Sequence, residues 1–309
     1  MPVPPSASPS SRWTPRWSST CWSSSTAPPS RSAEDAVDEH VSLRDPEGPP
    51  VELIQVRAGN PGPMTLTGTN SYVLRDGDLV WVVDPGPRDP EHLAELLLRC
   101  GAAARPQGVL VTHRHLDHSA GAATLARQLA ARSGHEVPLW AADPSAVPGA
   151  RPLPATLEGD HGTVGHVIHL PGHTSDSVAV LVDGGRLLSG DTLLGGSSTV
   201  IVPDDGGSLT EYLQSLAILR AMTVDGRIGS IHPGHGTVME TPLDALEAIE
   251  GAIAHRRERI EEVRRARTAG VLTMDRLLRV VYGPDLPAEL LGAARWNLRA
   301  TLEHLTEER

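Results

Sequence analysis

The stretch Thr112-His113-Arg114-His115-Leu116-Asp117-His118 places four potential metal-binding side chains within six residues. It follows the apolar run 108–111 and precedes residues 119–132, whose composition is typical of a helix. A strand that ends in a tight loop holds imidazoles and a carboxylate close together, and zinc takes these ligands at about 2.0–2.2 Å. The stretch contains no cysteine, so it predicts a catalytic site with an open position for water and not a closed thiolate cage.

Three further short motifs follow apolar runs downstream: Pro171-Gly172-His173-Thr174, Ser189-Gly190-Asp191-Thr192 and His232-Pro233-Gly234-His235-Gly236. Glycine beside a potential ligand lets the chain turn sharply at a strand end and lets the backbone approach a metal ion. Each motif alone is weak evidence, because Pro-Gly-His is more often a turn than a ligand. Together, in this order and spacing, the motifs indicate a single metal site.

These motifs and the earlier Val82-Val83-Asp84-Pro85-Gly86 resemble those of the metallo-β-lactamase fold superfamily over roughly residues 51–250. The resemblance implies seven metal ligands: His113, His115 and His173 for one ion, Asp117, His118 and His235 for a second, and Asp191 between the two. It also implies that Asp84 orients the histidine loop from behind, as outer carboxylates often do.

The complete ligand set is similar to that of dinuclear hydrolases such as glyoxalase II, RNase Z and the β-lactamase-like protein 2 family. Class B β-lactamases lack a bridging aspartate at the position of Asp191, and flavodiiron proteins carry glutamate at the position of His115. Residues 59–72 resemble the N-terminal block of the β-lactamase-like protein 2 family, which is the closest match. That family includes single-strand endoribonucleases and carrier-protein thioesterases, so the fold leaves the substrate open.

The order of apolar runs and turns predicts an α/β protein, and the resemblance implies the αβ/βα four-layer sandwich of the metallo-β-lactamase fold. We expect helices near 90–100, 119–132 and 208–222. We expect strands near 51–57, 71–75, 79–83, 108–112, 137–141, 166–170, 177–182, 186–189 and 227–231. The metal site would lie at the edge where the strand ends converge.

The chain is predicted to have three parts. Residues 1–45 are rich in serine and proline and are expected to form a disordered extension. Residues 46–250 are the predicted catalytic domain. Residues 251–309 are predicted to be a helical module, with one helix over 242–268 that leads into it and two more over 274–281 and 287–307. This tail resembles a small winged-helix-like domain without a clear wing.

Composition restricts the cellular compartment more than it restricts the substrate. The formal net charge is −11, and the two cysteines give no disulfide framework, which favours a reducing, cytoplasmic compartment. No apolar run approaches the roughly 20 residues that a membrane span needs. The only notable basic cluster is the arginine-rich stretch 255–267. The sequence does not determine the oligomeric state.

The ligand set predicts a hydrolase with two Zn²⁺ ions, for which manganese or iron could substitute. A hydroxide held between the metals would attack the substrate, and Asp117 would also hold and pass its proton. The resemblance slightly favours single-stranded RNA as substrate, with phosphates bound by Arg256, Arg257, Arg264 and Arg265. The acidic body favours the alternative, an acyl thioester, because it repels polyphosphate. A non-enzymatic binding module is the third alternative, and the complete ligand set disfavours it. The family resemblance also offers Thr69, Asn70 and Tyr212 as candidates to line the cleft.

Overall fold

Two β-sheets form the centre of residues 49–308, the part of the chain that this computed structural model describes. The predicted extension over residues 1–45 lies outside the described residues. The first sheet has the strand order β1 (Glu52–Arg57), β2 (Asn70–Asp76), β3 (Leu79–Val83), β4 (Arg105–Val111), β5 (Leu139–Ala141) and β6 (Arg151–Pro152). The second has the order β11 (Ser230–Pro233), β10 (Arg186–Gly190), β9 (Val178–Val182), β8 (Gly162–His169) and β7 (Thr156–Gly159).

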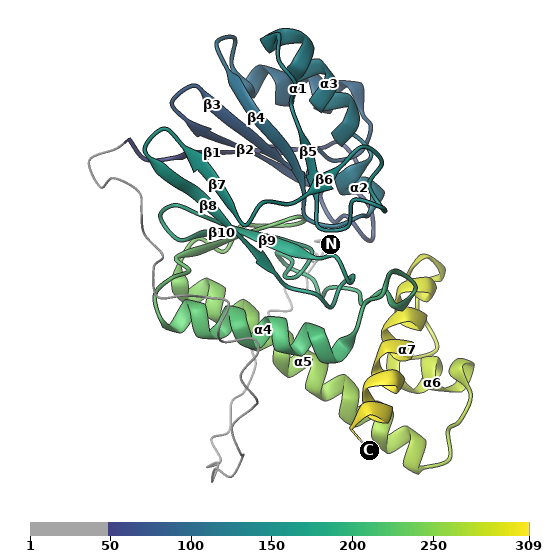
Figure 1. Cartoon of the computed structure of the whole chain (residues 1–309). Helices are drawn as coiled ribbons and strands as arrows, with labels where there is room; N and C mark the ends of the chain where they lie inside the picture. The colour runs from purple at the N-terminus through teal and green to yellow at the C-terminus, as the bar shows by residue number, and fades with distance from the viewer. Residues whose placement is uncertain (1–48, 309) are drawn as a thin grey trace, which may run out of the picture. The chain divides into compact units, whose positions relative to one another are not determined.

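Three apolar cores separate four layers (Figure 1). Helices α1 (Pro90–Cys100) and α3 (Ala122–Ser133) pack on one face of the first sheet, and the two sheets pack on each other around Trp81. Helices α4 (Leu209–Val224) and α5 (Pro242–Thr268) pack on the outer face of the second sheet. The predicted αβ/βα four-layer sandwich is therefore confirmed.

Strand direction brings the ends of five strands to the site edge. Strands β3, β4 and β5 are parallel, so Asp84, which directly follows β3, lies beside Thr112, which directly follows β4. In the second sheet, β10 and β11 are parallel, and β8 runs in the same direction because both β8 and β10 are antiparallel to β9. The segments that follow β4, β8, β10 and β11 carry the histidine loop, His173, Asp191 and His235.

Strand β4 is buried on both faces, as its unbroken apolar run indicates. Val109 and Val111 face the core beneath α1 and α3, and Leu110 faces the core between the sheets. Gly108 lies under the ring of Trp140, where a Cβ atom would come 2.2 Å from the ring. This packing fixes the position of β4 in the sheet and therefore the point at which the histidine loop begins.

The expected elements are present, with differences at short or glycine-containing segments. Strands β6 and β7 were not predicted, because β6 has two residues and only Leu157 of β7 is fully buried. Strand β8 begins at Gly162 and not at 166, because its first half contains two glycines, which are rare in strands. The last helix, α7 (Leu291–Glu307), begins after a 3-10 turn over Ala288–Leu290 and not at 287.

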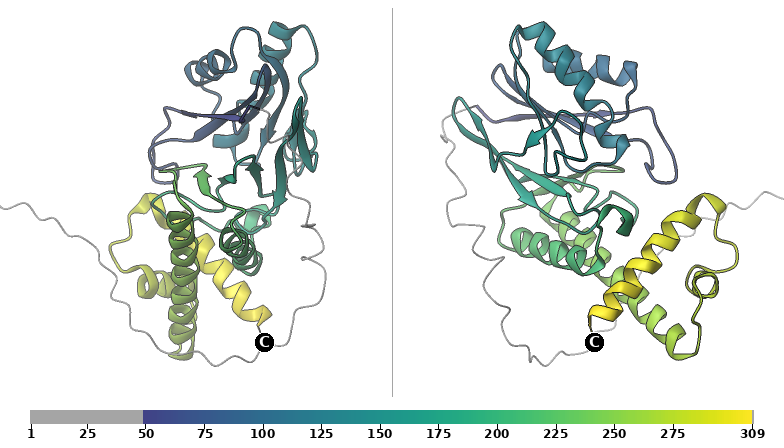
Figure 2. Two further views of the ribbon diagram at one scale, coloured as in Figure 1. Left: turned by 90° about the vertical axis from the view of Figure 1, so that its left-hand side faces the viewer. Right: turned by 45° about the vertical axis from the view of Figure 1, so that its right-hand side comes forward.

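The C-terminal region is helical. Helix α5 begins with a capping box in which Thr241 and Asp244 satisfy each other's backbone. Its first half contributes Ile249 to the core under the second sheet, and its second half contributes Val263 to a separate core with α6 (Met274–Tyr282) and α7 (Figure 2). One helix therefore crosses the predicted boundary at residue 250, and that boundary stays a prediction. No strand follows β11 within residues 49–308, so the winged-helix assignment also stays a prediction.

None of the described helices is long and apolar enough to cross a membrane. Cys100 is a buried free thiol, and burial raises its pKa to about 11. Cys21 lies outside the described residues.

Arg256 is internal, so the prediction that it contacts phosphate is wrong. Its side chain is 3% exposed, and its guanidinium lies over the ring of Tyr212. It donates hydrogen bonds to the Thr199 carbonyl and to Asn297 Oδ1. Arg257, next in sequence, is exposed. Arg256 therefore joins α5 to the segment that follows β10.

We expect Arg256→Ala to lower the free energy of unfolding by about 2–4 kcal/mol, because it leaves the carbonyl of the buried Thr199 without this donor and opens a cavity. Arg257→Ala is the matched control and should change it by less than about 0.5 kcal/mol. Urea unfolding of both variants, with metal removed by a chelator, measures the difference. Equal stability of the two variants would show that the internal contacts of Arg256 contribute nothing.

Candidate metal centre

The structure brings together all seven side chains that the motifs predicted as ligands. They form three overlapping groups: His113 with His115 and His173, His113 with His118 and Asp191, and Asp117 with His118 and His235. Within each group the potential ligand atoms lie within 4.8 Å of one another. Short helix α2 (Leu116–Ser119) presents Asp117 and His118 one turn after the other two histidines of the loop.

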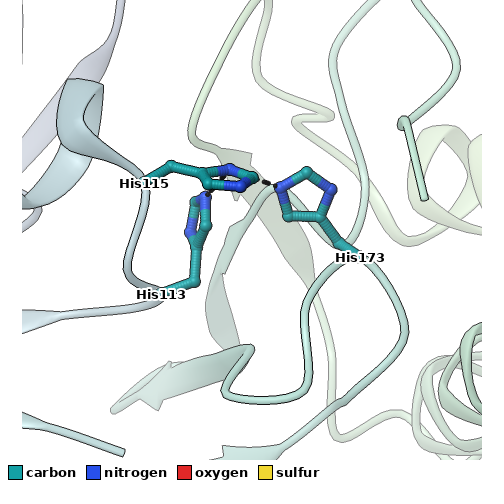
Figure 3. Close-up of side chains that lie close together, drawn as sticks. All are labelled: His113, His115 and His173. Atoms are coloured by element: carbon teal, nitrogen blue, oxygen red, sulfur yellow. Dashed lines mark hydrogen bonds between the residues drawn. The ribbon is translucent and has the colours of Figure 1, made fainter. Parts of the chain in front are cut away.

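Three imidazole nitrogens of the first group point toward one another (Figure 3). His115 Nδ1 lies 3.1 Å from His113 Nε2 and 3.0 Å from His173 Nε2. The outward nitrogens face oxygen acceptors: the Val200 carbonyl at 2.5 Å from His173 Nδ1, and Asp205 Oδ2 at 3.1 Å from His115 Nε2.

These partners decide where the protons lie. Because the outward nitrogens donate, the inward nitrogens are unprotonated acceptors. The same holds for His113, whose Nδ1 lies 3.1 Å from Thr112 Oγ1, a hydroxyl whose own proton goes to Asp84. Three lone pairs aimed at one point repel each other unless a cation lies between them. The donor set therefore fits a metal ion.

The second group is richer in carboxylate. His118 Nε2 and His235 Nε2 are 3.2 Å apart, and Asp117 Oδ2 lies 3.1 Å from His235 Nε2. The outward nitrogen of His118 faces Asp84 Oδ2 at 2.9 Å, and that of His235 faces the Gly68 carbonyl at 3.3 Å. These rings are thus also held from behind by oxygen acceptors.

Asp191 lies between the two groups. Its Oδ1 is 3.4 Å from His118 Nε2 and 3.5 Å from His235 Nε2, and its Oδ2 is 3.8 Å from His173 Nε2. No hydrogen bond of ordinary geometry reaches Oδ1 from any described residue, although the atom is buried. A buried carboxylate oxygen normally has a hydrogen-bond donor or a cation as its partner, so Oδ1 of Asp191 fits a metal ligand. The same side chain faces both groups of imidazoles.

Electrostatics differ between the groups when no metal is bound. Burial and the neighbouring imidazoles lower the pKa of His113 well below its usual value and that of His173 to about 4. Burial also opposes charge on His235, but Asp191 and Asp117 raise its pKa to about 9. His113 and His173 are therefore neutral near pH 7, whereas the carboxylates of the second group favour positive charge on His235. A metal ion would have to displace protons there, so its binding depends on pH.

Asp84 supports the site from behind. Its Oδ1 accepts a hydrogen bond from the Thr112 backbone N–H at 2.7 Å, and its Oδ2 accepts from Thr112 Oγ1 at 2.7 Å and from His118 Nδ1 at 2.9 Å. Its φ of +50° is unusual for a residue other than glycine. The Ser71 hydroxyl donates to the Asp84 carbonyl and holds this conformation.

Other supporting groups were not identified from the sequence. Asp205 orients His115, and the Val200 carbonyl orients His173. Both belong to residues 199–205, which we name the strap. Thr199 Oγ1 donates to the Asp191 carbonyl at 2.8 Å, so the strap also holds the shared carboxylate. The only local signal is the turn sequence Pro203-Asp204-Asp205-Gly206, which gives no indication of its partners.

The strap is tied in turn to the C-terminal helices. The Ile201 N–H donates to Asn297 Oδ1 at 3.0 Å, and Arg256 donates to the Thr199 carbonyl. Trp296 Nε1 and Arg299 both donate to Asp204. Helices α5 and α7 thus position residues that hold the first group of histidines.

The residues expected to line the cleft do not do so. Thr69 and Asn70 are fully buried, and Asn70 Nδ2 donates to the carbonyls of Pro233 and Gly236, which shapes the His235 loop. Tyr212 is buried beneath Arg256. Their polar atoms serve internal hydrogen bonds, which sequence position alone does not reveal.

Known proteins are similar to this chain in both sequence and fold. Residues 64–230 match the metallo-beta-lactamase superfamily. The chain is 31% identical over 275 residues to "Beta-lactamase-like protein 2 homolog" of Drosophila melanogaster, covering 83% of this chain and 88% of the relative. It is 29% identical to "Atrochrysone carboxyl ACP thioesterase" of Aspergillus fumigatus, covering 77% and 75%.

A solved beta-lactamase domain protein from Burkholderia ambifaria has the same fold, with a TM-score of 0.67 and 22% identity over 83% of this chain and 86% of that one. Relatives named as hydrolases support a hydrolase here as well. The superfamily match covers more than half of the chain and the 31% identical relative covers 83% of it, and the chain belongs to the metallo-β-lactamase superfamily.

Proposed function

We propose that the protein is a dinuclear metal-dependent hydrolase that cleaves acyl thioester bonds. The observation that carries the proposal is the arrangement of two groups of inward-pointing imidazoles with Asp191 between them. His113, His115 and His173 would hold one ion, and Asp117, His118 and His235 the other. Histidine and carboxylate ligands suit zinc, and also manganese or iron.

Two metal ions in this centre would lower the pKa of a water between them toward about 7 and polarise the scissile carbonyl. The protein's own side chains would orient the reacting groups and exclude water from them. Asp117 is 28% exposed and Asp191 10%, so Asp117 is on the side that substrate and water reach. Asp117 is thus the more water-accessible of the two carboxylates, and it is the group proposed to hold the proton released by the attacking water.

The charges around the centre favour a carbonyl substrate over a phosphodiester. Arg114, inside the histidine loop, is paired with Asp176 at 3.0 Å and Asp143 at 3.3 Å. Arg256 is buried beside the strap. Both arginines are thus committed to internal partners, and the net charge of −11 adds general repulsion toward RNA.

A single-strand endoribonuclease, expected from the family resemblance, has weaker support. Arg257 and Arg265 are exposed, but Arg264 is paired with Glu261 and Glu308. The similarity to a carrier-protein thioesterase adds weight to the thioester. We retain residues 46–250 as the proposed catalytic domain and 251–309 as the helical module. A cytoplasmic location stays a proposal that rests on the cysteine pattern.

The purified protein should contain close to two transition-metal ions per chain, because the two groups share one carboxylate. Elemental analysis of full-length protein purified without chelator measures this. A reproducible content of one ion or fewer, not restored by added zinc or manganese, would refute a dinuclear centre.

Single substitutions should separate the two positions. Asp191→Ala should disturb both sites and reduce activity by more than about 100-fold, because even an outer partner contributes 10–100-fold. His173→Ala should remove one ion and leave the second group able to bind. His169→Ala is the matched control: it lies four residues earlier, is exposed at the end of β8, and should keep both metal content and activity. The assignment fails if Asp191→Ala and His169→Ala have equal metal content.

A direct substrate comparison tests the reaction class. The zinc-loaded protein should hydrolyse acyl thioesters and leave a single-stranded RNA uncleaved with either zinc or manganese. RNA cleavage without thioester hydrolysis would instead establish the nuclease. Asp117→Asn should strongly lower whichever of the two activities is observed, which ties the measured activity to this centre.

A further inference from the structure

A cavity of about 190 Å³ opens onto the metal centre and continues between the catalytic part and the C-terminal helices. His173 and Asp191 line it at the metal end. Val200 of the strap and Leu194 follow. The cavity therefore continues directly from the position where the reacting bond would lie.

The far end of the cavity is apolar and is built by the C-terminal helices. Leu286, Leu290 and Ala293 line it there, and Met64 lines it from the loop between β1 and β2. Ala293 and the neighbouring Ala294 leave room on the buried face of α7, since a larger side chain at either position would project into the cavity. The two alanines therefore set how deep the cavity is.

The lining carries no arginine and no carboxylate other than Asp191, as judged over residues 49–308. Its polar groups are the side chains of Ser197, Ser198, Tyr282 and Asn297, with His173. Away from the metal centre, a phosphate in this cavity would lose its water without gaining a cationic side chain as a partner. An apolar chain would lose no hydrogen bonds and would bury its surface.

We propose that this cavity is an acyl-chain subsite, formed jointly by the metal centre and helix α7, that selects a medium-length or aromatic acyl group. The inference rests on the proposed thioesterase function and adds the chemistry of the acyl part. A cavity of about 150 Å³ holds a benzene ring, so this one accommodates an acyl group of roughly six to eight carbons. The C-terminal module thus supplies substrate selectivity, and the metal centre supplies the reaction.

The test uses zinc-loaded full-length protein and N-acetylcysteamine thioesters with acetyl, butyryl, hexanoyl, octanoyl and benzoyl groups. The thiol is small, neutral and constant, so differences report the acyl group alone. We expect kcat/KM to rise at least about tenfold from acetyl to octanoyl, because each buried methylene contributes roughly fourfold before the cost of immobilising the chain.

Variants assign the preference to the cavity. Ala293→Phe fills it and should lower kcat/KM for the octanoyl thioester at least about tenfold more than for the acetyl thioester. Leu290→Ala enlarges it and should move the optimum to longer chains. Leu291→Ala is the matched control, because Leu291 is exposed and does not line the cavity; it should leave the whole series unchanged.

A binding measurement gives a readout that is independent of hydrolysis. Calorimetry with octanamide on metal-free protein should show binding to wild type and to Leu291→Ala, and at least about tenfold weaker binding to Ala293→Phe.

The outcomes separate the two proposals. Hydrolysis of the acetyl thioester reports the proposed function, and the ratio of octanoyl to acetyl reports the subsite. Equal rates for acetyl and octanoyl in wild type, or parallel losses across the series in Ala293→Phe, would overturn the subsite and leave the thioesterase standing. Absence of any thioester hydrolysis would overturn both.

Discussion

The carboxylate of Asp84 accepts hydrogen bonds from the backbone and hydroxyl of Thr112 and from the ring of His118, and the geometry of the metal centre depends on this contact. It joins the end of β3 to the end of β4 and fixes the start of the histidine loop. Two parallel strands, both buried at the ends that approach the site, place these residues side by side. The backbone of Asp84 is held in a conformation that an aspartate rarely adopts, which is typical of functional sites whose surroundings determine the geometry.

The second sheet contributes the rest of the centre through a different support. There the strap, residues 199–205, orients His115 and His173 and holds the backbone of Asp191. The strap in turn contacts α5 and α7 through Arg256 and Asn297. The C-terminal helices are therefore part of the structure that positions the ligands, and a change in their packing would reach the first group of histidines through one short segment.

The type of reaction depends on the ligand set, whereas the choice of substrate depends on the charge and polarity of its surroundings. The ligand set would serve a carbonyl or a phosphorus centre equally well. What distinguishes the two is the surroundings: arginines paired internally near the centre, an acidic body, and an apolar cavity that begins at His173 and Asp191. These features are independent of the ligands, and they support the proposal of a neutral acyl substrate.

The sequence by itself determined the fold and which potential ligands lie together, because both depend on local patterns. Ligands that follow apolar strands, in the order histidine loop, His173, Asp191 and His235, are readable without coordinates, and the parallel and antiparallel strand ends brought them together as expected. Alternating apolar runs and helical stretches likewise gave the four layers. Short strands such as β7 were not predicted, because a single buried leucine does not produce an alternating apolar pattern.

Only the tertiary structure decided the roles of residues whose partners are distant in sequence. Arg256, one of a run of arginines, is buried on Tyr212 while Arg257 is exposed, because neighbouring residues on a helix face different directions. Asp205 reaches His115 across 90 residues. Asn70 and Tyr212 carry polar groups that suit a cleft, but they are used inside. The cavity beside His173 combines residues from the loop before β2 with residues of α7, and no local pattern encodes a space lined by segments so far apart.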